Sequence, residues 1–400
     1  MSRLDAAVAG GVVSGQVAEL PVVDAHCHGF QLDALRRRPA EGLIGRMTLM
    51  GMCAASSASL SPAAARLAGE LAEDTVFAQA MRRWLAAELD CPPAEVEATR
   101  AARLAGDAPA YLRGLLERNR VAALLVDDGY PLPPVDQAEL AATIGRPVHR
   151  VARIELLIAD LAPASGDWAE LEERFRAALE DLDAVAYKTV IAYRTGLDVA
   201  PWDDAAAERS FQAWRASGFK ASRELSKPCH DRLLLATLEV ARRQGRPVHI
   251  HSGAGDPDVV LGHVRPADLG WLLAEHDDQP IVLIHAGYPW LEEAAYLAAV
   301  YPAVYLELSL HVPWVTLDME RVFRTALGSV PAAKILYGSD EASEPEVIPF
   351  AAAYGRAALG RVLDEAVARD FVEQRAASRM AAAILGGNAL ALHGLRGAPA

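Results

Sequence analysis

Two histidines separated by one residue, His26 and His28, follow the apolar run that begins at Val22. Side chains at positions i and i+2 of a β-strand point to the same face, so both imidazoles can reach one cation there. Imidazole is a common ligand of zinc and other divalent metals. An isolated pair could equally be satisfied by hydrogen bonds or solvent, so the rest of the chain must decide.

Three later apolar runs also end in residues that bind metals. Two of them end in a histidine followed closely by a glycine, at His251 and at His285, and another ends in a carboxylate at Asp340. The carboxyl ends of parallel strands meet at one mouth, so these side chains are expected to gather there. The sequence therefore predicts a divalent-metal site built from several strands.

Short apolar runs alternate with amphipathic, helix-like segments along most of the chain. Several of these runs lack polar alternation, as expected for strands that are buried on both faces. The candidate strands are residues 22–25, 121–126, 148–155, 184–190, 247–251, 281–285, 303–308 and 335–338. Eight strands alternating with helices predict an α/β fold, a (β/α)8 TIM barrel, with a doubly wound open sheet as the alternative. The barrel is favoured because its closure brings Asp340 next to His26.

Residues 30–120 have a different pattern, rich in Ala and Leu with interspersed charges, which is typical of helices. We predict helices over residues 32–38, 62–80, 81–89 and 109–119, which together form a helical insertion after strand 1. This insertion could be a lid or a subunit interface. Residues 1–400 are expected to form a single barrel domain, with terminal helices over 367–395 that break at Gly386-Gly387.

Composition limits the function classes. The net charge of -14 argues against nucleic acid and anionic membranes as partners, because both require basic patches. No apolar run approaches the roughly eighteen residues of a membrane span, and the apolar stretch 6–13 is too short for a secretory signal. The four cysteines are widely spaced, without a C-x-x-C motif, which favours a reducing, cytoplasmic compartment. They are Cys27, Cys53, Cys91 and Cys229.

Other catalytic motifs receive little support. The chain contains neither the G-x-S-x-G elbow of serine hydrolases nor the G-K dipeptide of a phosphate loop. Gly253-Ala254-Gly255 resembles the start of a dinucleotide-binding loop, but the position of the third glycine is occupied by Asp258. We interpret this segment as a substrate loop.

The strand-end motifs together resemble the metal-dependent amidohydrolase superfamily, and in particular its amidohydrolase-2 type. Within that type, the chain is most similar to the amidohydrolase domain of the FluG and nodulin-like family, which is fused to glutamine synthetase. The segments that carry the resemblance are residues 23–28, 187–197, 247–253, 283–289, 336–340 and 387–389.

This resemblance implies a set of metal ligands and catalytic residues. The implied ligands are His26, His28, Lys188, His251, His285 and Asp340. Lys188 is either a carboxylated lysine that bridges two metal ions or an unmodified lysine that binds a substrate carboxylate. Asp340 would transfer protons, and His285 would bind a second metal or polarise the substrate carbonyl. One or two Zn²⁺ ions are the first expectation, with Mn²⁺, Fe²⁺ and Ni²⁺ also compatible. His249, one pleat below His251, is either a core histidine or a group that supports a ligand.

The expected activity is hydrolysis of a non-peptide amide bond in a small carboxylate-bearing substrate by a metal-activated water. Tyr193, Arg194 and Asp256 should lie near the barrel mouth, where Arg194 could pair with a substrate carboxylate and Asp256 with an ammonium group. Surface ion pairs are the alternative for these residues. The association of the similar domains with glutamine synthetase suggests a γ-glutamyl amide as the substrate.

Two other functions remain open. One is a metal-dependent nonoxidative decarboxylase of a small aromatic or unsaturated acid, although Glu341 and the residues after it differ from the Tyr-Pro-His continuation common in that branch. The other is a noncatalytic regulatory or binding module, which the filled set of ligand positions disfavours. We expect a homo-oligomer that acts on a small-molecule substrate.

Overall fold

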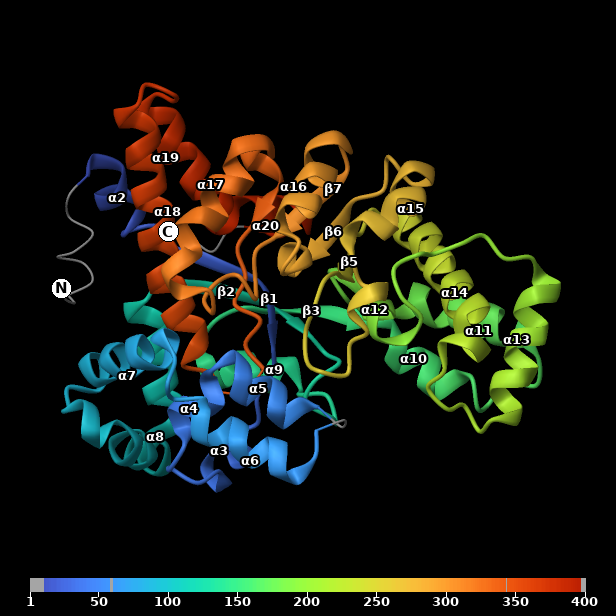
Figure 1. Ribbon diagram of the computed structural model, residues 1–400, viewed down its shortest axis with the longest axis horizontal. Coiled ribbons are helices and arrows are strands. Elements are labelled where there is room, and N and C mark those ends of the chain that lie inside the picture. Colours follow the sequence, from blue (N-terminus) through green and yellow to red (C-terminus); the bar gives the residue numbers. More distant parts are fainter. Residues whose placement is uncertain (1–10, 58–59, 343, 397–400) are drawn as a thin grey trace.

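Eight parallel strands surrounded by helices form the centre of the computed structural model, which describes residues 11–57, 60–342 and 344–396 (Figure 1). Each strand pairs with the next one along the chain. The strands are β1 (Val22–His28), β2 (Val121–Asp127), β3 (Val148–Arg153), β4 (Ala186–Thr189), β5 (Val248–His251), β6 (Ile281–Ile284), β7 (Val304–Glu307) and β8 (Ile335–Leu336).

The segment that follows β8 returns to β1 and closes the ring. The amide of Ala25 donates to the carbonyl of Tyr337 at 2.9 Å, and the amide of Asp340 donates to the carbonyl of His26 at 2.8 Å. The predicted TIM barrel is therefore confirmed, and the sequential strand order rules out the doubly wound alternative. All eight predicted strands are present, although β1 extends beyond the expected end at Ala25 to His28.

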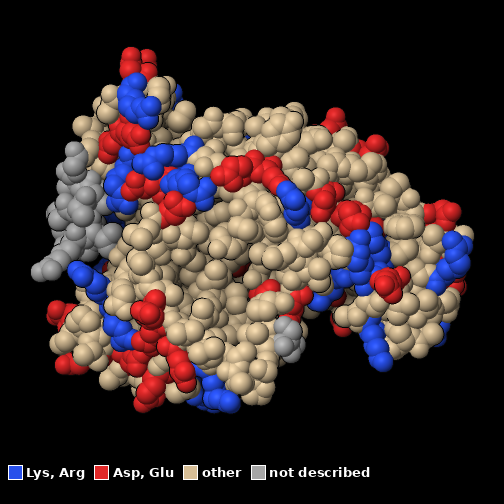
Figure 2. All heavy atoms as spheres, viewed as in Figure 1, with Lys and Arg blue, Asp and Glu red and all other residues tan. Residues whose placement is uncertain are grey.

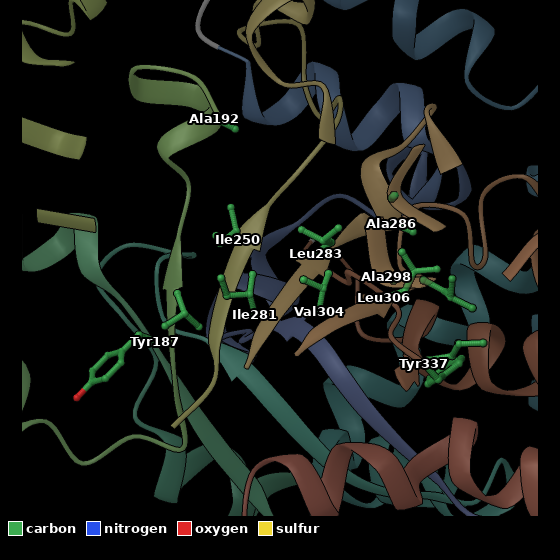
Figure 3. Close-up of a cluster of buried hydrophobic side chains, with 14 of the residues drawn as sticks. Tyr187, Ala192, Ile250, Ile281, Leu283, Ala286, Ala298, Val304, Leu306 and Tyr337 are labelled. Carbon is green, nitrogen blue, oxygen red and sulfur yellow. The ribbon is translucent and has the colours of Figure 1, made fainter. Parts of the chain in front are cut away.

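Alternate strand residues face either the surrounding helices or the barrel axis. In β6, Ile281 and Leu283 belong to the apolar layer between strands and helices, whereas Val282 and Ile284 belong to the core inside the barrel. Figure 3 shows the outer layer, with labelled side chains from neighbouring strands. The same alternation in β5 turns Ile250 outward, and His251 lines the cavity at the barrel mouth.

Strand β1 contains an irregularity between Asp24 and Cys27 that changes which face its side chains occupy. Ala25 belongs to the core inside the barrel, and unbroken alternation would therefore turn Cys27 inward as well. Instead, Cys27 packs in the outer layer. An extra residue in a strand reverses the alternation beyond it, which leaves both His26 and His28 facing the barrel mouth.

Helices cover the outside of the barrel and extend it on two sides (Figure 1). The described helices outside the insertion are α2 (Val12–Val17), α9 (Gln137–Ile144), α10 (Ile154–Leu161), α11 (Trp168–Asp181), α12 (Ile191–Arg194), α13 (Asp204–Ala216), α14 (Arg223–Gln244), α15 (Gly270–Glu275), α16 (Leu291–Val300), α17 (Met319–Ser329), α18 (Val347–Ala368), α19 (Gln374–Ala382) and α20 (Asn388–Leu392). None of the described helices combines the length and apolar composition that crossing a membrane requires.

The segment between β1 and β2 is helical, as predicted for the insertion. Its helices are α3 (Leu32–Arg37), α4 (Leu43–Met47), α5 (Leu49–Ser56), α6 (Pro62–Leu71), α7 (Val76–Leu89) and α8 (Val96–Arg118). They enclose a separate apolar core that includes Met81 and Trp84 and that continues onto Phe350 of α18. This core attaches the insertion to the barrel.

Two predicted helix boundaries in the insertion are wrong. Residues 62–80 do not form one helix, because the Thr75 side chain accepts a hydrogen bond from the amide of Ala78 and starts α7 there. Helix α8 begins at Val96 and not at Pro109. Its backbone breaks at Asp107, whose carboxylate accepts from the amide of Ala110, so Pro109 lies at the start of a new helical segment, where its missing N–H costs little.

The predicted helix break at Gly386-Gly387 is also wrong. The chain continues from α19 through a π-helical turn, Ala383–Gly387, directly into α20. A Cβ atom at Gly386 would lie 3.0 Å from Val23, so this glycine allows the helix to pack closely on β1. Residues 6–10 of the apolar N-terminal stretch lie outside the described residues, and the assignment of residues 1–400 to one domain stays a prediction.

Candidate metal centre

A cavity of about 590 Å³ opens at the carboxyl ends of the strands. It is lined by all nine residues that the sequence predicted to bind metal or substrate or to take part in catalysis, which are His26, His28, Lys188, Tyr193, Arg194, His251, Asp256, His285 and Asp340. Figure 2 shows a hollow near the middle of one face of the molecule. The convergence of these residues is what a parallel barrel predicts, while their individual roles stay predictions.

His26, His285 and Asp340 form one group that could hold a metal ion, since one ligand atom of each lies within 4.8 Å of the others. Nε2 of His26 is 3.0 Å from Oδ1 of Asp340, and Nδ1 of His285 is 4.0 Å from Oδ2 of the same carboxylate. Nε2 of His28 lies 3.6 Å from Oδ1. Two imidazoles and a carboxylate are a donor set that suits zinc and other divalent transition metals.

A second candidate group joins His26 and His28 to Asp127, the last residue of β2. Asp127 is buried and accepts from Nε of Arg153 at 2.9 Å and from Nη2 at 2.5 Å. Burial opposes ionisation of Asp127, but the Arg153 guanidinium holds its pKa well below the usual range. Sequence reasoning missed Asp127, although it ends an apolar run in a carboxylate, as Asp340 does.

The buried Lys188 lies between these two groups. Its Nζ is 3.3 Å from Nε2 of His26 and 3.8 Å from Oδ2 of Asp127. Burial lowers the pKa of Lys188 to about 8, against the opposing attraction of Asp127. A lysine with a lowered pKa is more often neutral, and the neutral amine is the form that reacts with carbon dioxide.

Burial favours the uncharged form of three imidazoles of the cavity, those of His26, His251 and His285. It lowers the pKa values of His26 and His285 well below the usual range and lowers that of His251 to about 3. Within the described residues, Nδ1 of His26, Nδ1 of His28 and Nε2 of His251 are buried without a hydrogen-bond partner. Neutral imidazole is the form that binds a metal, so the donor chemistry of the cavity fits a divalent cation.

Two of the predicted site residues have a strained backbone. Asp340 has a φ of 52° and His285 a φ of 66°, in the left-handed region that favours glycine. The amide of Asp340 donates to the carbonyl of His26, and the amide of His285 donates to the carboxylate of Glu307 at 3.1 Å. Such strain persists only where the surrounding structure enforces it, and it is concentrated at functional sites.

Two buried carboxylates hold these strained segments in place. Asp24 accepts from the amide and the hydroxyl of Ser339, and Glu307 accepts from the amide and the hydroxyl of Ser309. The Ser309 hydroxyl also lies 2.8 Å from Nδ1 of His285. Burial raises the pKa of Asp24 to about 7 and that of Glu307 to about 8. Asp24 and Glu307 therefore lie below the cavity, where they hold the backbone segments that carry Asp340 and His285.

His249 lies deeper in the barrel than His251. Its Nε2 is 2.9 Å from Nε2 of His393, which follows α20, and the first residue of α20, Asn388, donates to the carbonyl of Ile335 at the start of β8. Burial lowers the pKa of His249 well below the usual range. The contact with His393 favours the first of the two interpretations that the sequence allowed, a histidine of the barrel core.

Tyr193 and Asp256 form the wall of the cavity beside His251. The ring of Tyr193 packs edge-on against His251 at 4.8 Å between centroids, and its hydroxyl accepts from the amide of Asp256 at 3.2 Å. A Cβ atom at Gly255 would collide with this hydroxyl, so a larger residue in the segment interpreted as a substrate loop would displace Tyr193. Arg194 lines the same cavity and is exposed.

The helical insertion also contributes to the cavity, in line with the lid that the sequence offered as one alternative, but sequence reasoning singled out none of its residues. Arg38, Arg46 and Cys53 line it, and the Cys53 thiol lies 3.7 Å from the carbonyl of Gly255. The run of three arginines that ends at Arg38 was a signal in the sequence, but nothing local shows that this run turns toward the barrel.

Comparisons with known proteins agree with this architecture. The family model for amidohydrolases of the Amidohydro_2 type matches residues 155–395. Protein fluG of Emericella nidulans is 30% identical over 421 residues, which cover 95% of this chain and 46% of fluG. The chain thus spans about half the length of this curated relative.

Solved structures share the fold. A crystal structure described as a metal-dependent hydrolase, from Lactobacillus casei, superposes with a TM-score of 0.82 at 24% identity, covering 96% of this chain and 97% of the other. A uronate isomerase from Bacillus halodurans has a TM-score of 0.66 at 13% identity, covering 96% of each chain. Glucuronate isomerase from Caulobacter crescentus has a TM-score of 0.67 at 15% identity, covering 97% of this chain and 94% of the other. At these identities the likeness concerns the fold alone.

Proposed function

The chain belongs to the amidohydrolase family, whose model matches more than half of it, and on that premise we propose that it hydrolyses the amide bond of a small carboxylate-bearing molecule. Membership of this family supports a metal-dependent hydrolase. The observation that carries the finer proposal is the presence in one cavity of neutral imidazoles, Lys188 and Asp340, with Arg194 and Asp256 on the wall. A γ-glutamyl amide is the first substrate to test.

We assign the metal to side chains that share the cavity and whose donor atoms suit a divalent cation. They are His26, His28, His251, His285 and Asp340, with Lys188 as a bridging ligand if it is carboxylated. Zinc is the first candidate, as one or two ions. When bound, such a cation lowers the pKa of a water ligand toward about 7 and so supplies a nucleophile at neutral pH.

Asp340 is proposed to take the proton of the attacking water and to pass it to the leaving amine. Burial opposes its ionisation, but interactions with His285, His28 and Lys188 hold its pKa at about 2, so it is a carboxylate at neutral pH and can accept a proton. Its strained backbone and the hydrogen bond to His26 fix the direction of this carboxylate. His285, held by Ser309, is proposed either to bind a second metal ion or, where it binds none, to polarise the substrate carbonyl.

Arg194 and Asp256 are proposed to bind the amino-acid end of the substrate. A guanidinium can pair with a carboxylate through two hydrogen bonds, and a carboxylate can bind an ammonium group. Tyr193 supports this arrangement, because its hydroxyl holds the backbone at Asp256. We further propose a cytoplasmic location and a homo-oligomer, on the grounds of the dispersed cysteines and the large Ala- and Leu-rich insertion.

The test uses the purified full chain, stripped with a chelator and reloaded separately with Zn²⁺, Mn²⁺, Fe²⁺ or Ni²⁺. Release of amine from γ-glutamyl amides, dependent on the added metal, would support the proposal. Release of carbon dioxide from aromatic acids without amine release would support a decarboxylase instead. Failure to take up any metal would leave a noncatalytic binding module as the better description.

A further inference from the structure

The helical insertion places two arginines on the cavity wall, and both contact one buried carboxylate. Arg38 lies between α3 and α4, and Arg46 lies on α4. Glu344, four residues after Asp340, is completely buried; its Oε1 lies 2.8 Å from Nε of Arg46 and 3.3 Å from Nη1 of Arg38. The loop after β8 is thus joined both to the candidate metal centre and to the insertion.

A third arginine completes this buried group of ion pairs. Nη2 of Arg100, from α8, lies 2.5 Å from Oε2 of Glu344, and its Nε lies 2.7 Å from Oε1 of Glu346. Tyr111 also donates to Glu346, at 2.9 Å. The group therefore joins three guanidinium groups to two carboxylates, so it has one positive charge in excess, and it reaches the cavity through Arg38 and Arg46.

The guanidinium group of Arg46 holds the backbone between α3 and α4. All three nitrogens of Arg46 donate, Nε to Glu344, Nη1 to the carbonyl of Glu41 and Nη2 to the carbonyl of Pro39. Arg46 therefore fixes the loop that carries Arg38. The Arg38 side chain lines the cavity and keeps 32% of its surface exposed, against 24% for Arg46, so it is the better placed of the two to bind a ligand.

The positions of Arg38 and Arg194 in the barrel are far apart. Arg38 belongs to the insertion after β1 and is held by the loop after β8, whereas Arg194 follows β4 and Asp256 follows β5. In an eight-stranded barrel with sequential order, β4 and β5 lie across the axis from β8 and β1. In Figure 1, α12 and the helices α3 to α6 lie at different edges of the strands. His26 and Asp340 line the same cavity as both arginines.

We propose that Arg38 binds an anionic group on the amine half of the substrate, so that the preferred substrates are amides with a carboxylate on each side of the scissile bond. This inference rests on the proposed function, in which Arg194 and Asp256 bind the acyl half. Glu344 is a positioning residue that holds Arg38 at the cavity. Arg153 also lines the cavity, but its guanidinium is paired through two nitrogens with the carboxylate of Asp127.

The first experiment compares two substrates that differ only in the charge of the leaving amine, γ-glutamylglycine and γ-glutamylethylamide. The wild type should prefer γ-glutamylglycine in kcat/KM. Arg38→Gln should raise KM for γ-glutamylglycine about 10- to 100-fold, the usual range for losing a charge-assisted hydrogen-bonded pair, and change the values for γ-glutamylethylamide less than about twofold. Arg37→Gln, at the neighbouring exposed arginine at the end of α3, is the matched control. Equal effects on both substrates, or none, would overturn the inference.

A binding measurement separates this inference from the proposed function. Calorimetry with glutarate, a dicarboxylate that cannot be hydrolysed, should show binding to the wild type and to Arg37→Gln, and at least tenfold weaker binding to Arg38→Gln. If that pattern holds while no amide is hydrolysed, the anion site stands and amide hydrolysis is wrong. If γ-glutamyl amides are hydrolysed and neither KM nor glutarate binding depends on Arg38, the function stands and this inference is wrong.

Discussion

The amine of Lys188 lies 3.3 Å from Nε2 of His26, so the carboxyl ends of β4 and β1 meet inside the barrel. These strands are not neighbours in the sheet, and their side chains come together only because the sheet closes on itself. The buried amine and the neutral imidazole therefore belong to one site, to which β8 adds Asp340.

Metal content tests the role of Lys188. We expect about two equivalents of metal in the wild type by plasma mass spectrometry, and about one in Lys188→Ala, because a carboxylated lysine can bridge two ions. Lys220→Ala, at an exposed lysine, is the control. One equivalent that survives Lys188→Ala would instead make Lys188 a residue that binds substrate, and His26→Ala should lower metal content in either case.

Replacing Asp340 by Asn should lower kcat by about 10²- to 10⁴-fold, the usual contribution of a proton-transferring side chain. Asp370→Asn is a matched control, because Asp370 also has a positive φ, of 59°, yet lies exposed before α19. Steady-state kinetics should show this fall in kcat for Asp340→Asn and not for Asp370→Asn. A fall in kcat of less than about tenfold in Asp340→Asn would contradict the proposed proton transfer.

Arg194→Gln should raise KM about 10- to 100-fold with little change in kcat, because the lost ion pair contributes to substrate binding before and during the reaction alike. Arg209→Gln, on the exposed face of α13, serves for comparison. An unchanged KM would assign Arg194 to the protein surface, as its exposure alone would suggest.

Arg100→Met should destabilise the fold by about 3–5 kcal/mol, because it leaves the buried carboxylates of Glu344 and Glu346 without their shared guanidinium. Urea denaturation of this variant and of Arg103→Met, an exposed position on the same helix, measures the difference. The double variant Arg100→Met with Glu346→Leu should recover part of the loss. If Arg100→Met unfolded at the same urea concentration as Arg103→Met, the ion pairs of Arg100 with Glu344 and Glu346 would not stabilise the fold.

His230 makes the stability depend on pH. It is buried, it hydrogen-bonds through Nδ1 to the carbonyl of Ser226, and burial lowers its pKa to about 4. The pKa of His230 is about 6.5 in the unfolded state, so between pH 6.5 and pH 4 mainly the unfolded state takes up the proton. Lowering the pH from 7 to 4 should therefore reduce the free energy of unfolding by about 3 kcal/mol through this residue. Above pH 6.5 this reduction should disappear.

Urea denaturation at both pH values tests this expectation. His230→Gln should lose correspondingly less stability on acidification than the wild type, while His263→Gln, in the loop after β5, should follow the wild type. Equal losses in wild type and His230→Gln would show that His230 does not contribute.

The sequence by itself determined the barrel and most of the candidate site. Strand positions follow from local apolar runs, and His251, His285 and Asp340 end such runs, so their convergence follows once the strands are parallel. The helix boundaries at Thr75 and Asp107 were harder to predict, because a single capping side chain moves them within a segment that is helical throughout.

Only the tertiary structure decided how the site is completed. The irregularity in β1 sets the facing of His26 and His28, and it depends on the pairing with β2 and not on the residues of β1 alone. The pairing of Asp127 with Arg153 and the contact of Arg38 with Glu344 join segments that are distant in the chain. Burial then shifts the pKa of Lys188, because desolvation depends on everything packed around the amine, which no local pattern of residues records.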